Sequence, residues 1–327
     1  MSSINFSIPK EKLCETYNVK TKILSDLIPG DTSTYIYNSE EDYYTEYKNS
    51  YFAITRKKGG WDCMRHYEIL ANGCIPTFID IEKCPEKTLA LLPKNLLIEA
   101  NILFNKFKNK NINELTKEVI EEYNILREKL LYYTKNYLTT EKMAEYILQK
   151  IGVENKVTKI LYLSGDTQPD YLRCTTLHGF KTLIGSNCHD YPKIEHIYKS
   201  KNIDIKNLYG KGISYTNLLD PEFHNENLDT TLIEDIKNKY YDIIIYGSYH
   251  RGIPYYDLIC SIYKPNEIIL LCGEDFHYCN YNEYVNKGHF VFVRELPQSS
   301  IIKFWKEDSD LKYPTYDLQY FIRYYKY

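Results

Sequence analysis

The sequence predicts an α/β protein built from two Rossmann-like domains that face each other across a cleft. With 327 residues, the chain is long enough for two domains that each own a hydrophobic core. Short runs rich in Ile, Leu and Val alternate with segments of helical spacing, as expected for parallel sheets covered on both faces. Several runs end in glycine and a polar residue, as at the edge where open α/β sheets bind ligands. We expect a first domain over residues 1–152, a second over 153–296 and a C-terminal extension over 297–327.

The first domain is predicted from a stretch that has the pattern of strand, basic turn, helix and strand. Residues 51–55 are apolar and β-rich, and residues 56–60 follow with the sequence Arg-Lys-Lys-Gly-Gly. A helical pattern begins at Trp61, stops at Gly73 and gives way to a strand over residues 74–79. Three further helices are expected, over residues 89–107, 113–137 and 139–151.

The second domain is predicted from uninterrupted apolar strands. They cover residues 157–164, 241–246 and 267–272, with a helix over 170–178 and a short strand over 181–184. Polar residues follow these strands closely: Asp166, Ser248, His250, Glu274 and Asp275. Because the carboxyl ends of parallel strands share one edge of the sheet, we expect these side chains to face the cleft.

Composition and charge narrow the class of protein. The formal net charge of -3 argues against bulk nucleic-acid binding, which needs a strong basic excess. No segment has the apolar length of a signal peptide or a membrane span, so we expect a cytoplasmic protein without a membrane span. The nine cysteines form no C-x-x-C pair, which favours reduced, packed thiols over a zinc site or a disulfide framework.

The turn over residues 56–60 has the composition of an anion site. Glycines, cations and unpaired backbone N–H groups at a helix N-terminus together stabilise a phosphate. Further along, Arg65 and Glu68 lie three residues apart on one helical face. A carboxylate beside an anion site suits a ligand with a diphosphate and a ribose, such as a nucleotide-sugar. The alternative is a surface Arg-Glu pair on an ordinary βαβ unit with a solvated turn.

Residues 65–76, RHYEILANGCIP, resemble the R-x-x-E-x-L-x-x-G-C-I-P segment of exostosin-like glycosyltransferases. With KKGGWDC before them, they are similar to a group of viral and algal glycosyltransferases. The resemblance implies the donor-binding domain of a GT-B fold, a UDP- or GDP-sugar as co-substrate, no tightly bound cofactor, and a glycan acceptor. It also implies that Glu68 holds the ribose and that Arg65 and the basic turn hold the diphosphate. The donor-binding candidates are Thr55, Arg56, Lys57, Lys58, Gly59, Gly60, Trp61, Arg65 and Glu68.

The order of the two domains departs from that family. In the relatives, the domain with G-D-x-x-P-D-Y-L and G-E-D-x-H comes first, whereas here residues 165–172 follow the donor motif. Residues 4–9 resemble the segment that usually follows the Phe-x-Arg-Glu of residues 292–295. The chain therefore resembles a circularly permuted member, which is tolerable when the parent termini lie close together at the surface.

Sugar transfer needs a stabilised leaving diphosphate and, with inversion, a base for the acceptor hydroxyl. The resemblance favours inversion. Asp166 follows the first strand of the second domain and is the first candidate base, ahead of Asp275, Glu274 and His250. Each of these residues could instead be a helix cap or an ordinary loop residue.

No D-x-D metal motif is present, and residues 80–82, Asp-Ile-Glu, come nearest to one. We therefore expect metal-independent transfer, in which the basic turn and Arg65 replace a metal ion. Two other functions stay open. A methyltransferase or other nucleotide-cofactor enzyme would use residues 161–166 as a Rossmann start, although no G-x-G-x-x-G follows a strand. A non-catalytic nucleotide-sugar or glycan-binding protein would keep the fold and lack the base.

Overall fold

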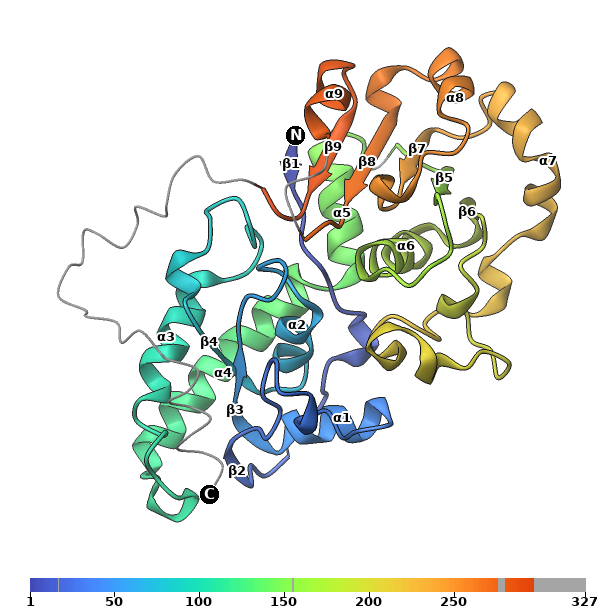
Figure 1. The fold of residues 1–327 in the computed structure, drawn as a ribbon. Helices are drawn as coiled ribbons and strands as arrows, with labels where there is room; N and C mark the ends of the chain where they lie inside the picture. The colour runs from blue at the N-terminus through green and yellow to red at the C-terminus, as the bar shows by residue number, and fades with distance from the viewer. Residues whose placement is uncertain (17, 155, 276–279, 297–327) are drawn as a thin grey trace.

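The chain forms two parallel β-sheets, one of six strands and one of three, each accompanied by helices (Figure 1). The computed structural model describes residues 1–16, 18–154, 156–275 and 280–296. The predicted α/β class with parallel sheets is confirmed. The predicted extension over residues 297–327 lies outside the described residues.

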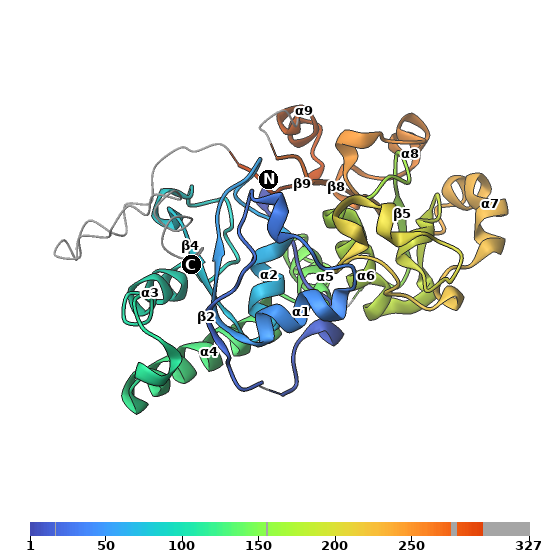
Figure 2. The same ribbon diagram turned by 60° about the horizontal axis from the view of Figure 1, so that its bottom comes forward.

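The smaller sheet has the strand order β2 (Lys22–Leu24), β3 (Ser50–Thr55) and β4 (Ile75–Phe78). The helices of this part of the chain are α1 (Glu40–Lys48), α2 (Met64–Ala71), α3 (Lys94–Phe104) and α4 (Lys117–Tyr137). Figures 1 and 2 show α1 and α2 on the side of this sheet that faces the larger sheet, with α3 on the opposite side. α2 therefore lies between the two sheets.

Residues 51–79 are named the donor motif after the resemblance described above, and their predicted strand, turn, helix and strand are confirmed with one shift. Gly73 ends α2 in the left-handed conformation, at φ 62°, as expected for a glycine that stops a helix. However, α2 begins at Met64 and not at Trp61. The delay is local, because Trp61 is held outside the helix: its carbonyl accepts a 2.8 Å hydrogen bond from His66 Nε2.

The larger sheet has the order β1 (Ser2–Ser3), β9 (Phe290–Val293), β8 (Ile268–Cys272), β7 (Ile243–Tyr246), β5 (Ile160–Leu163) and β6 (Cys188–Tyr191). Its helices are α5 (Thr140–Lys150), α6 (Tyr171–Ile184), α7 (Glu226–Lys237), α8 (Tyr256–Ile262) and α9 (Tyr281–Asn286). The strand order reverses between β5 and β7. In open α/β sheets, such a switch point is where ligands bind, at the carboxyl ends of the strands.

One predicted strand was wrong. Residues 181–184 continue α6, and the edge strand of the sheet is β6, a few residues later. β6 was missed because His189 and Asp190 interrupt its apolar pattern. Both side chains are nevertheless buried. Their polar groups have partners, because His189 Nδ1 lies 2.6 Å from the Tyr241 hydroxyl and Asp190 forms a 2.7 Å ion pair with Lys181. Buried polar groups that are paired in this way fit a strand that sequence patterns do not reveal.

The chain crosses between the two sheets more often than a boundary at residue 152 implies. β1 pairs in parallel with β9, so the first residues belong to the larger sheet and not to the first domain. α5 packs against α6 so closely that a Cβ added at Gly179 would lie 2.1 Å from the Thr140 carbonyl oxygen. The backbone pairing and this helix contact therefore join both segments to the second half.

A continuous hydrophobic core connects the two halves. The largest buried cluster includes Phe52 of β3, Leu130 of α4, Ile147 of α5 and Tyr162 of β5. A second buried cluster covers the other face of the larger sheet, around Leu161, Ile244 and Leu270. No helix in the described ranges is long and apolar enough to cross a membrane.

Candidate functional site

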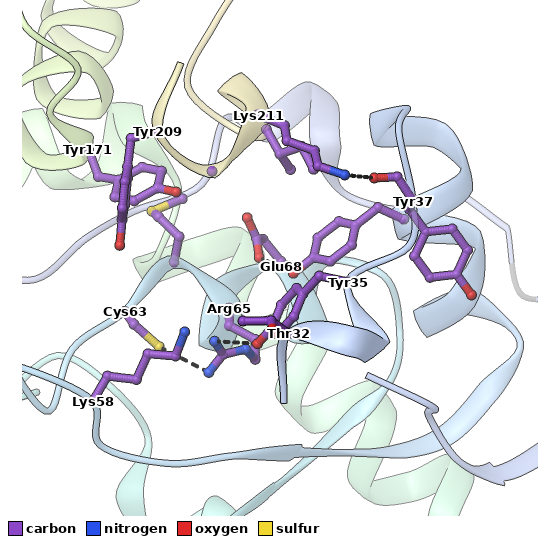
Figure 3. A pocket seen from close by; sticks show the side chains of 14 residues that line it. Thr32, Tyr35, Tyr37, Lys58, Cys63, Arg65, Glu68, Tyr171, Tyr209 and Lys211 are labelled. Carbon is purple, nitrogen blue, oxygen red and sulfur yellow. Dashed lines mark hydrogen bonds between the residues drawn. The ribbon is translucent and has the colours of Figure 1, made fainter. Parts of the chain in front are cut away.

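Two adjoining cavities lie between the halves of the molecule. The tyrosine cavity, of about 450 Å³, is lined by Thr32, Tyr35, Tyr37, Tyr43, Lys58, Cys63, Met64, Arg65, Glu68, Tyr171, Tyr209, Gly210, Lys211 and Ile213 (Figure 3). The carboxylate cavity, of about 530 Å³, is lined by Phe6, Lys58, Gly59, Gly60, Asp62, Cys63, Met64, Gln168, Pro169, Asp170, Tyr171, Tyr209, His250, Arg251, Gly273, Glu274, Asp275 and Arg294. Five residues line both: Lys58, Cys63, Met64, Tyr171 and Tyr209. The cavities therefore meet between the start of α2 and two tyrosines of the second half.

The N-terminus of α2 lacks the usual side-chain cap. Its N-cap residue, Cys63, makes no capping hydrogen bond, and no acidic residue lies in the first turn. By contrast, α5 and α6 are capped by the side chains of Thr139 and Asp170. An uncapped helix start carries unpaired N–H groups and a partial positive charge, and Arg65 in the first turn adds a cation. The junction of the cavities can therefore hold an anion.

Glu68 is buried on the cavity side of α2, with 5% of its surface exposed. Its Oε2 accepts a 2.7 Å hydrogen bond from the Tyr43 hydroxyl, and its Oε1 accepts a 2.6 Å bond from Ser214 Oγ. Burial raises the pKa of Glu68, although these hydrogen bonds oppose the rise. Arg65 is also buried, so the alternative of a surface Arg-Glu pair is wrong.

Only one of the three cations in the basic turn lines the cavities. Lys58 lies in both linings, and burial together with the charge of Arg65 lowers its pKa. Lys57 is exposed, with its Nζ 5.6 Å from the centre of the Trp61 ring. Arg56 is outside both linings, beside Gly30, where an added Cβ would lie 2.7 Å from its Nη2.

Gly59 and Gly60 bring carboxylates close to the backbone. A Cβ on Gly59 would lie 2.5 Å from Asp275 Oδ2, and a Cβ on Gly60 would lie 2.4 Å from Glu295 Oε1. Glu295 Oε1 also accepts a 2.9 Å hydrogen bond from the Asp62 N–H. The predicted close approach to these glycines is therefore made in this structure by side chains of the second half.

Thr55 and Trp61 shape the turn and do not line either cavity. Thr55 Oγ1 lies 2.8 Å from His66 Nδ1, while His66 Nε2 bonds the Trp61 carbonyl. Burial lowers the pKa of His66 to about 4, so the ring is neutral near pH 7 and Nε2 carries its proton. The Thr55 hydroxyl consequently donates to Nδ1, and the ring fixes the turn to β3.

Three of the candidate base residues, His250, Glu274 and Asp275, line the carboxylate cavity. His250 Nε2 lies 3.1 Å from Glu274 Oε1, and burial lowers the pKa of this imidazole. Asp275 is bound by Arg294 Nη2. Among the described residues, the contact of Glu274 is this one from His250 to Oε1, and no donor reaches Oε2. Its partner is thus an imidazole with a lowered pKa, whereas Asp275 is held by an arginine.

Asp166 lies outside the lining of both cavities. Its Oδ1 accepts a 3.0 Å bond from Arg173 Nη1, and its Oδ2 lies 3.5 Å from Arg251 Nη1. Partial burial raises its pKa, but the hydrogen bonds from Arg173 and the Gln168 N–H and the charge of Arg251 lower it overall. This carboxylate pairs with arginines of its own domain.

Sequence reasoning missed four charged residues of the carboxylate cavity: Asp62, Asp170, Arg251 and Arg294. Asp62 is buried, accepts hydrogen bonds from the Phe6 N–H (2.7 Å) and the Tyr67 hydroxyl (2.9 Å), and has a pKa raised to about 6 by burial. Asp170 accepts 2.9 Å bonds from the Arg173 N–H and Arg251 Nε. Arg294 joins the halves, since its Nη1 donates to the Asp62 carbonyl at 2.7 Å. Asp62 is part of the KKGGWDC motif, and its place there is the sequence feature that could have identified it as a site residue.

The described residues contain no group of three or more His, Cys, Asp or Glu side chains that could hold a metal ion. Seven cysteines within residues 1–16, 18–154, 156–275 and 280–296 are free: Cys14, Cys63, Cys74, Cys84, Cys174, Cys188 and Cys260. Cys272 is disulfide-bonded, which departs from the expectation of reduced thiols.

The fold and the site define an α/β protein with two parallel sheets and two adjoining cavities at the start of α2. No protein-family model, curated protein or solved structure matches the chain.

Proposed function

We propose that the protein is a glycosyltransferase of GT-B arrangement that moves a sugar from a nucleoside-diphosphate sugar to a hydroxyl of a glycan or another acceptor. One observation carries the proposal. The uncapped start of α2, with Lys58 and Arg65, lies between the buried carboxylate of Glu68 in one cavity and the carboxylate of Glu274, with its Oε2 open, in the other. A nucleotide-sugar needs these three features in this order: a ribose acceptor group, an anion site and a base.

The donor nucleotide fits the tyrosine cavity. The ribose hydroxyls would donate to Glu68, whose two oxygens keep free lone pairs beside the bonds from Tyr43 and Ser214. The diphosphate would lie at the α2 N-terminus, near Lys58 and Arg65. The tyrosine rings of this cavity offer flat apolar faces for the base.

Glu274 is the base that this arrangement favours over Asp166. The other carboxylates of the carboxylate cavity are already held by donors: Asp62 by Phe6 N–H and Tyr67, Asp170 by Arg173 and Arg251, and Asp275 by Arg294. Glu274 can therefore accept a proton on Oε2 without giving up the contact of Oε1 with His250. His250, 3.1 Å away, fixes its position from one side.

The proposed step conserves atoms and charge. The acceptor oxygen forms a bond to the anomeric carbon as its proton passes to Glu274. The bond between the anomeric carbon and the phosphate oxygen breaks, and its electron pair goes to the nucleoside diphosphate. Lys58, Arg65 and the α2 N-terminus stabilise the charge that develops on this leaving group, so no metal ion is required. Attack from the Glu274 side, opposite the leaving group, inverts the anomeric centre.

The permuted domain order is part of the same proposal. It is supported by the parallel pairing of β1 with β9, because residues 4–6 leave that edge beside Arg294, whose guanidinium lies 4.5 Å from the Phe6 ring. A chain that continued after β9 in a parent protein would take the same path.

The proposal is tested in two stages. A thermal-shift screen with UDP, GDP, S-adenosylmethionine and NAD should give stabilisation by a nucleoside diphosphate alone. In a donor and acceptor panel, Glu274→Gln should lower turnover about 10²-fold or more while leaving nucleotide affinity unchanged. Glu234→Gln, on the exposed face of α7, is the matched control. Binding without transfer or donor hydrolysis would instead identify a non-catalytic binding protein, and stabilisation by S-adenosylmethionine a methyltransferase.

A further inference from the structure

A segment of the second half reaches across to the donor motif. This crossing segment, residues 209–214, lies between β6 and α7 in the sequence, and Tyr209, Lys211 and Ile213 from it line the tyrosine cavity. Figure 3 shows Lys211 above the cavity, where its Nζ donates to the Tyr37 carbonyl at 2.6 Å. One wall of the proposed nucleotide site is thus supplied by the opposite domain.

Ser214, at the end of the crossing segment, is built into the first half. Its side chain is buried, with 1% exposed, and its N–H donates to Glu40 Oε1 at 2.8 Å. Its hydroxyl donates to Glu68 Oε1 at 2.6 Å, and the Tyr44 hydroxyl lies 2.6 Å from the same Oγ. The Tyr44 hydroxyl also donates to Glu40 Oε1 at 3.0 Å, so Ser214 lies beside Glu40 through both its N–H and this tyrosine.

The backbone of the crossing segment is held in an unfavourable conformation. Lys211 has φ 55° and Ser214 has φ 73°, both in the left-handed region that residues other than glycine rarely adopt. Such conformations persist where surrounding contacts hold them, and they concentrate at functional sites. Here the contacts that hold Ser214 are its bonds to Glu40, Tyr44 and Glu68 of the first half.

We propose that Ser214 is a positioning residue of the nucleotide site: its hydroxyl, supplied by the second half, orients the Glu68 carboxylate toward the ribose. The inference rests on the proposed function in one respect, that the ligand of Glu68 is the ribose of a nucleotide. With Tyr43 holding Oε2 and Ser214 holding Oε1, the carboxylate cannot rotate, and its remaining lone pairs face the cavity. Nucleotide affinity therefore depends on the closed contact between the two halves.

The hydrogen bond from Ser214 also favours the ionised form of Glu68 and so lowers the pKa that burial raises. Without it, Glu68 takes up a proton at higher pH. The acid limit of nucleotide binding should then move upward in pH, a change that a purely structural contact would not produce.

Ser214→Gly separates positioning from stability, because glycine adopts a positive φ without strain and removes only the hydroxymethyl group. The unfolding temperature should stay near that of the wild type, while the Kd for UDP or GDP rises about tenfold, as for loss of one hydrogen bond to a charged group. In Ser214→Gly, the loss of binding on acidification should occur at higher pH than in the wild type. In Glu68→Gln, which cannot take up this proton, that loss should be absent. Asn217→Gly, which relieves a positive φ of 53° in the same loop without a contact to Glu68, should bind as the wild type does.

Calorimetry over a pH series measures both quantities without any sugar transfer. The role of Ser214 would be overturned if Ser214→Gly bound the nucleotide as tightly as the wild type and lost binding at the same low pH. That result would leave the proposed function intact. A wild type that binds no nucleoside diphosphate would overturn the proposed function and this inference together. If the glycine variant does not fold, Ser214→Ala, which removes only the hydroxyl oxygen, gives the same comparison.

Discussion

Removal of the Glu68 carboxylate is the most direct perturbation of the proposed donor site. In Glu68→Ala the ribose hydroxyls lose a charged acceptor, and hydrogen bonds to charged groups contribute about 1.5–3 kcal/mol each. The Kd for the nucleoside diphosphate should therefore rise roughly 10- to 150-fold. Glu68→Gln keeps the shape and one acceptor oxygen, so its loss should be smaller, roughly tenfold.

The assay for Glu68 is isothermal titration calorimetry with UDP and GDP on folded protein. Tyr43 and Ser214 lose their acceptor in the alanine variant, so its unfolding temperature is measured alongside. Glu99→Ala, at an exposed position of α3, is the control and should bind as the wild type does. Unchanged affinity in folded Glu68→Ala would refute the assignment of this carboxylate to the ribose.

Three further predictions concern other charged groups of the site. Asp166→Asn should leave turnover nearly unchanged, because this carboxylate pairs with arginines outside both cavities; a loss of about 10²-fold or more would return the base role to it. Turnover should survive exhaustive treatment with EDTA, and activity restored only by manganese or magnesium would contradict the role given to Lys58 and Arg65. The third is a pH effect: folding raises the pKa of Asp62 from its ordinary 3.8 to about 6, so the stability it contributes is complete below 3.8 and is lost as pH rises through 6. In Asp62→Asn this part of the fall in unfolding temperature should disappear, as a pH series of thermal melts will show.

The elements that sequence reasoning predicted well are those with a local signal. β3, β4 and the end of α2 follow from apolar runs and from Gly73, and the large parallel sheet follows from its Ile- and Leu-rich strands. β6 was missed because its buried polar residues are satisfied by partners far away in the sequence. The helix start was misplaced for a similar reason, since the contact between His66 and Trp61 is a matter of three-dimensional packing.

In the candidate site too, sequence reasoning predicted residues that are close together in the chain and missed contacts between residues that are far apart. The donor motif placed Lys58, Arg65 and Glu68 in one region because a turn and one short helix connect them. It could not show that Ser214 bonds Glu68 or that Arg294 bonds the Asp62 carbonyl, because more than a hundred residues separate the partners in each pair. The expectation that polar residues at the carboxyl ends of strands face the ligand could not separate Glu274 from Asp166 either. Both follow a strand, but only Asp166 has arginines beside it.

At Gly59 and Gly60 the predicted close approach to the backbone occurs, but the approaching groups are protein carboxylates. Glycine removes the Cβ wherever another group must approach the backbone, whether that group is a phosphate or a carboxylate. At Gly59 and Gly60 the approaching groups are Asp275 and Glu295, and Glu295 already takes the Asp62 N–H. The donors left for a diphosphate are therefore at the start of α2, next to Lys58 and between the two cavities. In that position the leaving group would be bound by the first half while carboxylates of the second half face the sugar. Under the proposed function, the interlocked halves would then bring the anion site and the base to the same cleft, with the domain order reversed relative to the family that the chain resembles.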